Sequence, residues 1–417
     1  MQKLPNMFRK SLAQLPLLLL LGVLAVQGAH AQSMGAAPAW AQSMTPGTWA
    51  AISQNTMADV DPANDASTNS RYPSAPAYNG NTGQAGVVGA WSGGALATGL
   101  GTKGSLITWG GGHQDYYGNE VYAFDLATQR WRRLSNPYQN ISFPANSSGL
   151  WPDGSPSVPH SYGFAGYHPG TNSFVSLMTQ VSNSPSNATT PVLFDLSTGK
   201  WRSGPKDSGG FLVYGGWAVY DRSRDAWWGE GGDSGGNFVK YTMNGNGTAG
   251  SWTNFSAKFS ALDSRAAIDP VHDMLAVTLF NHDDSIRGID LKNPGNDAVT
   301  LRQGGSIPSR SGAAGWEWSD ARQAFIYWRQ GTGVYEVKLS GSDWRTGTWN
   351  WSNLSVGGGA TPQDQGTGVY NRFRLARYDD MEIAVVVNQV NGPVYAYRIP
   401  GGGPVKHPNP PTDVSAN

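Results

Sequence analysis

One short strand pattern recurs through the sequence, and this repetition restricts the fold more than any other feature. The copies fall into one register, with Phe124, Phe194, Tyr241, Ile289, Val337 and Tyr397 at the equivalent position. The six copies are VYAFDL (121–126), PVLFDL (191–196), FVKYTM (238–243), IRGIDL (286–291), VYEVKL (334–339) and VYAYRI (394–399). The middle copies follow one another about every 48 residues. Such a period indicates an architecture built from one repeated supersecondary unit.

Each copy lies within a larger unit that holds three further strand candidates. An apolar segment such as LITW (106–109) precedes it, and a first strand before that ends in a turn-rich stretch such as DRSRDA (221–226). In several units a tryptophan opens a fourth strand, at Trp131, Trp201, Trp252 and Trp349. We therefore predict an all-β fold, a β-propeller of six four-stranded blades. A seventh blade in 54–88 or 138–159 is the alternative, although neither stretch is long enough for four strands.

The two ends of the repeat region are complementary. The last unit lacks its tryptophan strand, because YAYRIP runs directly into the glycine- and proline-rich residues 401–417. The segment GTWAAIS (47–53) can supply that strand and close the ring, which leaves no free sheet edge. We expect a propeller domain over 46–400, a flexible segment at 32–45 and a flexible tail at 401–417.

Residues 1–31 have the pattern of a signal peptide. Lys3, Arg9 and Lys10 precede the apolar run 15–26, and the small-residue site AHA ends at Ala31. We expect a secreted or periplasmic protein with no membrane span, since no later stretch is apolar for long enough. The chain has no cysteine and therefore no disulfide. Its 29 acidic and 29 basic residues argue against a nucleic-acid partner, and we expect a monomer.

The repeat resembles the kelch and galactose-oxidase-like propellers. The resemblance rests on GGG (110–112) after a second strand, on VYAFDL and on the spaced tryptophans, and it covers most of residues 46–400. It implies kelch-like blades but no particular activity, because one fold carries many functions. Galactose oxidase activity is not expected, since that family needs a cysteine bonded to a copper-ligating tyrosine.

The order of strands within a blade predicts which polar residues share a face. The loop after the second strand and the loop entering the first strand open at one end of the central axis, and the turn between those two strands lies at the other. His113 and His282 follow second strands, and His160 enters a first strand. His168 and His272 lie in the turns and should face away.

Further polar residues gather at the same end as His113. They are Tyr162, Tyr214, Asp233, Arg265, Arg310, Arg329, Arg372 and Asn388. Any single arginine of this set can instead form hydrogen bonds with buried strand ends or with neighbouring loops. Convergence from at least five blades nevertheless predicts a functional site.

This residue set suits one chemistry best. Arginines grip carboxylates or sulfates with paired hydrogen bonds, and a histidine or tyrosine can move a proton. Together they fit β-elimination of a uronate-containing polysaccharide. A glycosidase would need two flanking carboxyl groups, and none are obvious here. No short metal-ligand spacing links the histidines, so we expect neither a metal nor another cofactor.

The set is similar to that of the propeller-fold ulvan lyases, in residue type and blade position rather than in an unbroken motif. This resemblance implies His113, His160, Tyr214 and Arg265 as catalytic residues, with Tyr162 and Arg310 as rivals. The substrate-binding candidates are Tyr117, Tyr162, His282, Arg310, Arg329, Arg372 and Asn388. The substrate class would be an acidic polysaccharide, and the enzyme a carbon-oxygen lyase.

Two alternatives remain open. A non-catalytic glycan-binding propeller would use aromatic side chains that stack on sugar rings, such as Trp91, Trp217, Trp316 and Trp318. A copper oxidase without the cysteine crosslink would bind copper through the histidines, and metal analysis would distinguish it.

Overall fold

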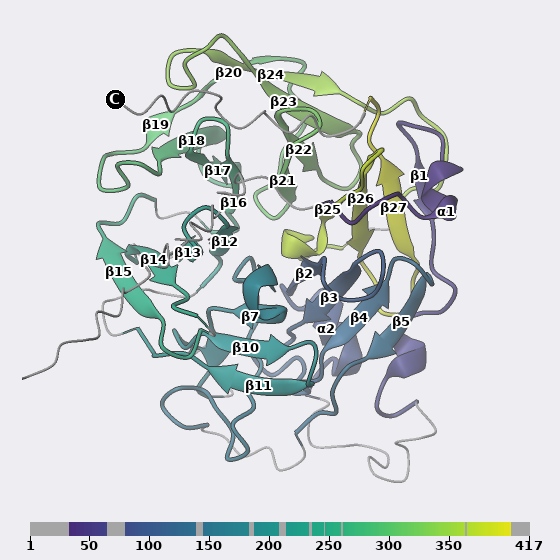
Figure 1. Ribbon diagram of the computed structural model, residues 1–417, viewed down its shortest axis with the longest axis vertical. Helices are drawn as coiled ribbons and strands as arrows, with labels where there is room; N and C mark the ends of the chain where they lie inside the picture. The colour runs from purple at the N-terminus through teal and green to yellow at the C-terminus, as the bar shows by residue number, and fades with distance from the viewer. Residues whose placement is uncertain are drawn as a thin grey trace, which may run out of the picture.

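Six antiparallel sheets stand as blades around a central axis in the computed structural model (Figure 1). The structure describes residues 33–64, 80–138, 145–182, 187–207, 214–232, 236–245, 247–259, 262–362 and 365–401. The prediction of an all-β propeller is confirmed, with six blades across these ranges. The expected signal peptide, and the expected tail beyond residue 401, lie outside the described residues. Within the described part, no helix is both long enough and apolar enough to span a bilayer.

Every blade has four antiparallel strands, which follow one another in order from the axis outward, and a fifth strand is added to blade 5. Blades 1 and 2 comprise β2 (Gly93–Ala97), β3 (Ser105–Trp109), β4 (Tyr122–Asp125) and β5 (Arg130–Arg133), then β6 (Ala165–His168), β7 (Ser173–Ser176), β10 (Val192–Asp195) and β11 (Lys200–Ser203). Blades 3 and 4 comprise β12 (Trp217–Asp221), β13 (Ala226–Glu230), β14 (Phe238–Thr242) and β15 (Ser251–Phe255), then β16 (Arg265–Asp269), β17 (Met274–Leu279), β18 (Ser285–Asp290) and β19 (Val299–Thr300). Blades 5 and 6 comprise β21 (Gly315–Ser319), β22 (Ala324–Trp328), β23 (Val334–Ser340) and β24 (Thr348–Asn353), then β25 (Arg374–Arg377), β26 (Glu382–Val387), β27 (Val394–Arg398) and β1 (Trp49–Ala51).

Short elements connect or extend the blades. They are α1 (Ala39–Gln42), α2 (Gly86–Gly89), β8 (Thr179–Gln180), β9 (Asn187–Ala188), β20 (Arg302–Gly305) and the 3-10 turns η1 (Ala58–Val60), η2 (Gly83–Ala85), η3 (Pro169–Thr171) and η4 (Tyr370–Arg372). The segment 32–45, for which we expect flexibility, contains α1. Ala41 of α1 is buried, and the Trp40 indole donates a hydrogen bond to the Leu126 carbonyl at 2.7 Å.

Burial explains the sequence pattern of the strands. The second strands β17 and β26 are packed on both faces by neighbouring blades, and each is buried along its whole length. The outer strand β5 is exposed on alternate residues, and only Trp131 is buried in it. The repeated tryptophan packs on an aromatic ring of the third strand, as Trp131 does on Phe124 with ring centroids 5.4 Å apart. The tryptophan spacing therefore reflects how each outer strand is anchored.

The ring closes through the N-terminal strand, as the sequence predicts. Strand β1 pairs antiparallel with β27 and places Trp49 opposite Tyr397, and the two strands lie side by side in Figure 1. The Trp49 ring also lies 5.1 Å from the Trp328 ring of blade 5. Residues at opposite ends of the chain thus complete blade 6 and fasten it to its neighbour.

Blade 5 carries one strand that the sequence pattern does not predict. After the two-residue β19, the chain leaves blade 4 and continues as β20, which pairs in parallel with β24. Blade 4 has no tryptophan in this outer region, and Val299 is only half-buried. The outer strand of blade 4 is therefore short, and the backbone hydrogen bonds of the next residues are made with blade 5.

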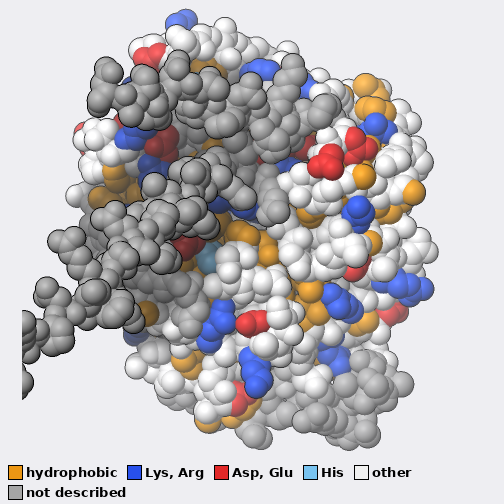
Figure 2. All heavy atoms as spheres, in the orientation of Figure 1, with side chains coloured by type: hydrophobic (Ala, Val, Ile, Leu, Met, Phe, Trp, Pro, Cys, Tyr) orange, Lys and Arg blue, Asp and Glu red, His pale blue; other side chains and the backbone are white. Residues whose placement is uncertain are grey.

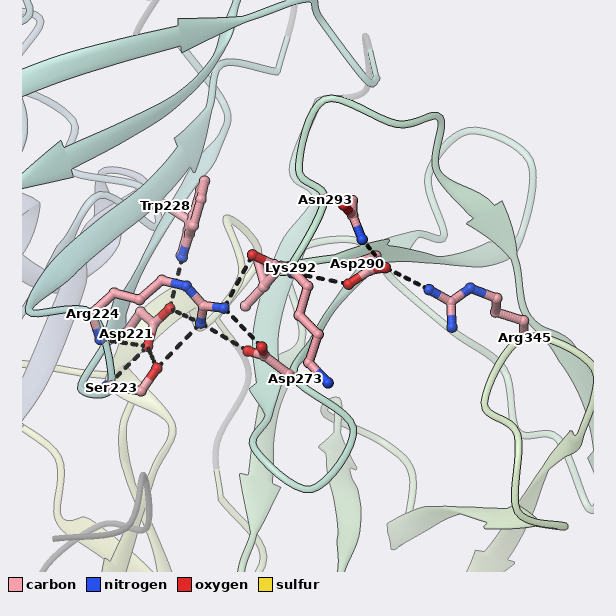
Figure 3. A network of polar contacts seen from close by, with 10 residues as sticks. Asp221, Ser223, Arg224, Trp228, Asp273, Asp290, Lys292, Asn293 and Arg345 are labelled. Carbon is pink, nitrogen blue, oxygen red and sulfur yellow. Dashed lines mark hydrogen bonds and ion pairs between the residues drawn. The ribbon is translucent and has the colours of Figure 1, made fainter. Parts of the chain in front are cut away.

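Ion pairs join neighbouring blades (Figure 3). Arg224, in the β12–β13 turn, pairs with Asp221 of its own blade at 2.8 Å and with Asp273 of blade 4 at 2.7 Å. Asp290 of blade 4 pairs with Arg345 of blade 5 at 2.6 Å. In the face drawn in Figure 2, acidic and basic side chains of the described residues are interspersed around the ring. This mixture is consistent with the zero formal net charge.

The closing strand yields a stability prediction. We expect Trp49→Ala to lower the free energy of unfolding by about 3–5 kcal/mol, because it removes a buried indole from the contact between blades 5 and 6. The matched control is Trp91→Ala, which removes an indole that is 38% exposed and should change stability by about 1 kcal/mol or less. Urea denaturation measures both values. Equal effects would show that ring closure does not depend on Trp49.

Candidate functional site

The central axis has two ends, which we call the first mouth and the second mouth. The innermost strands begin at the first mouth, where Trp91, Tyr162, Tyr214 and Tyr370 lie just before β2, β6, β12 and β25. The innermost strands end at the second mouth, where His168 is the last residue of β6 and His272 lies in the β16–β17 turn. The first mouth is the end at which we expect the functional residues.

Bulky residues with a left-handed backbone conformation lie at the first mouth. Trp91, Tyr162 and Tyr370 have φ angles of 46°, 41° and 43°. Asp263, two residues before β16, has a φ of 57°. This left-handed conformation is uncommon for bulky residues and costs about 1–3 kcal/mol per residue. Strain of this kind persists only where the surrounding structure holds it in place. It is found most often at functional sites.

The glycine run 110–112 explains how His113 reaches the first mouth. Gly110 and Gly111 have φ angles of 149° and 118°, which other residues rarely adopt. A side chain on Gly112 would collide with the Val158 carbonyl and the Gln180 side chain. His113 follows with a φ of 57°, and its backbone N–H donates to the Gln180 side-chain oxygen at 2.8 Å. The glycines therefore let this loop turn against blade 2.

Four aromatic rings from three blades form a cluster at this mouth. The rings of His113 and His160 have centroids 4.0 Å apart. The Tyr214 ring is parallel to that of His113, with a centroid distance of 6.4 Å and an angle of 9°. The Trp91 ring lies 4.9 Å from His160 on another side. Trp91 and Tyr214 are 38% and 39% exposed, so the cluster opens to solvent.

His160 is the buried member of this cluster. Burial lowers its pKa to about 4, although a hydrogen bond with the Gly112 backbone opposes that shift. Its Nε2 lies 2.9 Å from an oxygen of Asp115. Burial also raises the pKa of Asp115, against the effects of the His113 charge and of Thr82. His160 is therefore neutral at neutral pH, and the Asp115 contact fixes its ring orientation.

A buried cation lies deeper on the axis. The Arg265 side chain is 2% exposed, and its Nη2 donates to the Asn371 side-chain oxygen. Its Nε and Nη1 have no hydrogen-bond partner in the described structure. The guanidinium lies 5.6 Å from the Tyr370 ring centroid, and Tyr370 donates to Asp263 at 2.5 Å. Burial lowers the pKa of Arg265 to about 10, which leaves it charged at neutral pH.

Tyr162 links the ring cluster to Arg265. Its ring lies 5.9 Å from His160, 5.6 Å from Tyr214 and 5.8 Å from Tyr370. The structure thus brings His113, His160, Tyr162 and Tyr214 together, with Arg265 reached through Tyr370. Sequence reasoning missed the roles of Tyr370, Asp263 and Asn371, although their position just before a first strand matches that of Tyr162.

Other expected site residues have different surroundings. Arg372 is fully buried and donates to the backbone carbonyls of Ser92, Val387 and Gly368. Arg310 and Arg329 form a separate group at blades 4 and 5. Arg310 bonds Asp284 and Gln303, and Arg329 donates to the Arg310 carbonyl at 3.1 Å.

The last three expected binding residues are His282, Asn388 and Tyr117. His282 is exposed in the β17–β18 turn. Asn388 is buried just after β26. Tyr117 is half-buried, and burial together with the Asp115 charge raises its pKa.

The histidines at the second mouth are engaged in local contacts. His168 Nε2 lies 2.6 Å from Asp225, and His272 Nδ1 lies 2.6 Å from Asp269. Among the described residues, no group of three or more histidines and carboxylates is placed to hold a metal ion. The first mouth therefore offers proton-transfer groups and a cation.

No protein-family model and no curated protein matches the sequence.

The low pKa of His160 predicts a pH dependence of stability. The unfolded chain takes up this proton near pH 6.5, whereas the folded protein takes it up only at about pH 4. The unfolded state therefore binds more protons within this range, and the free energy of unfolding should fall by roughly 3 kcal/mol from pH 6.5 to pH 4. Because burial raises the pKa of Asp115, protonation of Asp115 favours the folded protein and offsets part of this loss at the acidic end of the range. Denaturant titrations across this range measure the change.

His160→Asn should remove most of this loss, because the variant has no imidazole to protonate. His282→Asn, at an exposed position, is the control and should behave like the unmodified protein. If His160→Asn leaves the pH slope unchanged, another group causes it.

The surroundings of Arg372 predict a structural effect. Arg372→Gln should lower the free energy of unfolding by about 3 kcal/mol or more, since a buried carbonyl without its partner costs about 1–3 kcal/mol. Arg329→Gln is the comparison and should cost less than about 1.5 kcal/mol, because its bonds lie closer to solvent. Thermal or urea unfolding gives both values. A fully stable Arg372→Gln variant would contradict the structural role.

Proposed function

We propose that this protein is a polysaccharide lyase, exported from the cell, that cleaves a uronate-containing anionic polysaccharide by β-elimination. The observation that carries the proposal is the cluster of His113, His160 and Tyr214 above the unpaired Arg265 cation. Proton-transfer groups next to a buried positive charge are what elimination beside a carboxylate requires. The sequence of residues 1–31 supports export.

The reaction breaks two bonds and forms one double bond. A base removes the proton from C5 of the uronate, the C4–O glycosidic bond breaks, and a C4=C5 double bond forms. An acid donates a proton to the departing oxygen. Positive charge near the carboxylate stabilises the carbanion that develops at C5, which lowers the barrier.

We assign proton transfer to His113 and Tyr214. Their parallel rings come from different blades, and both are more exposed than His160. His160, with a pKa of about 4, is a weak base, so its role is to hold the His113 ring in place. Which of His113 and Tyr214 is the base depends on how the sugar enters between them.

Arg265 supplies the positive charge from below the rings. Its guanidinium lacks a carboxylate at hydrogen-bond distance, and two of its nitrogens have no partner among the described residues. The negative charge of Asp263 offsets part of its field, and the unused donors remain for an anionic group at the first mouth. Low surrounding polarity strengthens this effect, because charges interact more strongly away from water.

A second candidate function is glycan binding without catalysis. The exposed Trp91 beside His160 favours it, since an indole face can stack on a sugar ring. In that case Trp91 and Tyr214 provide the contact surface and Arg265 attracts the anionic chain. The two functions differ in whether an unsaturated product forms.

The experiment is a panel of acidic polysaccharides, assayed by the ultraviolet absorbance of unsaturated uronate ends. His113→Ala and Tyr214→Phe should each lower kcat by about 100- to 10,000-fold, because a positioned proton-transfer group contributes that much. Arg265→Ala should lower kcat by about 100-fold or more. His272→Ala, at the second mouth, is the control and should retain activity.

Two outcomes would contradict the lyase. One is full activity of the His113 and Tyr214 variants. The other is folded protein that forms no unsaturated product from ulvan, alginate, pectate, glucuronan or glycosaminoglycans. Saturable binding that weakens with salt and in Arg265→Ala would then support the glycan-binding module.

A further inference from the structure

The second mouth holds a cavity that the proposed reaction does not use. Its volume is about 200 Å³, and the ends of the innermost strands line it. An engineered protein cavity of about 150 Å³ accepts benzene, so this one has room for a six-membered ring. The lining residues that matter here are Tyr167, Tyr220, Arg222, Ile268, Glu317 and Arg374.

The carboxylates that line this cavity are already paired within the protein. Arg224 binds both Asp221 and Asp273, as Figure 3 shows. Glu317 accepts the Leu375 backbone N–H at 2.7 Å and pairs with Arg374 at 3.2 Å. Asp320 accepts from the Trp318 indole at 3.0 Å and lies 3.5 Å from Arg377. None of these carboxylates needs a cationic ligand.

Two arginines at the cavity retain unused donors. Arg222 is half-buried and makes no hydrogen bond or ion pair within the described residues; its charge lowers the pKa of the nearby Tyr167 and Tyr220 against the larger effect of burial. Arg374 uses Nη2 on Glu317, and its buried Nε has no partner there. A guanidinium that keeps free donors beside a cavity suits an anionic group, which it can bind with two hydrogen bonds.

Apolar side chains form part of the walls between these charges. Leu96, Val219 and Ile268 face the cavity together with Trp227 and Trp318. The hydroxyls of Tyr167 and Tyr220 bond Asn172 and Asp225, at 3.0 Å and 2.9 Å. The tyrosines therefore hold fixed orientations. Such walls fit the faces of a saturated ring better than a fully hydrated ion.

We propose that this cavity is a second binding site, for a monosaccharide-sized ring that carries one carboxylate, such as a free uronic acid. Arg222 and Arg374 bind the carboxylate, and the apolar walls contact the ring. A single negative charge is favoured over a phosphate dianion, because Asp221, Asp273 and Glu317 line the same cavity and repel additional charge. The proposal does not depend on the lyase activity.

Asn371 marks the boundary between this cavity and the first mouth. Its side chain lines the cavity, accepts from Arg265, and donates to the Gly163 and Ala165 carbonyls at 2.9 Å and 2.6 Å. The two sites therefore share an axis but are separated by a fixed side chain. Variants at one mouth can be used to test binding at the other.

The test is calorimetric titration of the protein with D-glucuronate, with D-glucose and glucose 6-phosphate as comparison ligands. We expect glucuronate to bind more tightly than either. Arg222→Ala should weaken glucuronate binding about tenfold or more, as loss of a charge-assisted hydrogen bond does. The variant should keep its melting temperature, since Arg222 makes no internal bond. Arg132→Ala, which removes the same charge from the exposed face of β5, is the matched control and should bind normally.

Binding at the first mouth is distinguished by His113→Ala, which should bind glucuronate like the unmodified protein. The proposal is overturned if glucuronate does not bind, or if glucose or glucose 6-phosphate binds equally well. It is also overturned if His113→Ala loses binding while Arg222→Ala retains it, because the ligand would then occupy the first mouth. Failure of the lyase assay would leave these results unaffected.

Discussion

Crowding at the central axis is the constraint on which the rest of the structure depends. Six innermost strands converge there, so backbones must approach more closely than side chains allow. A Cβ atom on Gly93 would collide with the Tyr162 carbonyl, and one on Gly163 would collide with the Arg265 guanidinium. A Cβ on Gly315 would likewise meet the Phe373 ring. Glycines therefore occupy these points of close approach, and the Arg265 side chain fits beside Gly163.

This constraint also divides the axis into two chemically different sites. Arg265 and Asn371 fill its middle, and Asn371 is fixed by two backbone carbonyls. Above them, residues in left-handed conformations such as Trp91 and Tyr370 flank the histidines. Below them, the strand ends leave a cavity with paired carboxylates and partly free arginines. The division arises because strand starts and strand ends present different loops to the axis.

The sequence predicted the parts of this arrangement that follow from periodicity. The repeat gave the blade number, and the missing last tryptophan gave the closure by Trp49, because both depend on strand order alone. Strand order also predicted that His113, His160 and Tyr214 share an end of the axis. It could not reveal that Arg372 donates to three backbone carbonyls, since those carbonyls come from three separate chain segments. Strand β20 and the cavity were missed for the same reason, as both result from how neighbouring blades pack.

The buried arginines show how packing separates structural from functional charges. Arg377 lies within 3.5 Å of carboxylate oxygens of Asp320 and Glu382, and Arg372 has three carbonyl acceptors. Both have the partners that a buried cation needs, because an unpaired buried charge costs several kcal/mol. Arg265 has one amide acceptor and two unused nitrogens. In the proposed function, an anionic group of the substrate at the first mouth offsets this cost. The same argument from unused donors underlies the roles proposed for Arg222 and Arg374 at the second mouth.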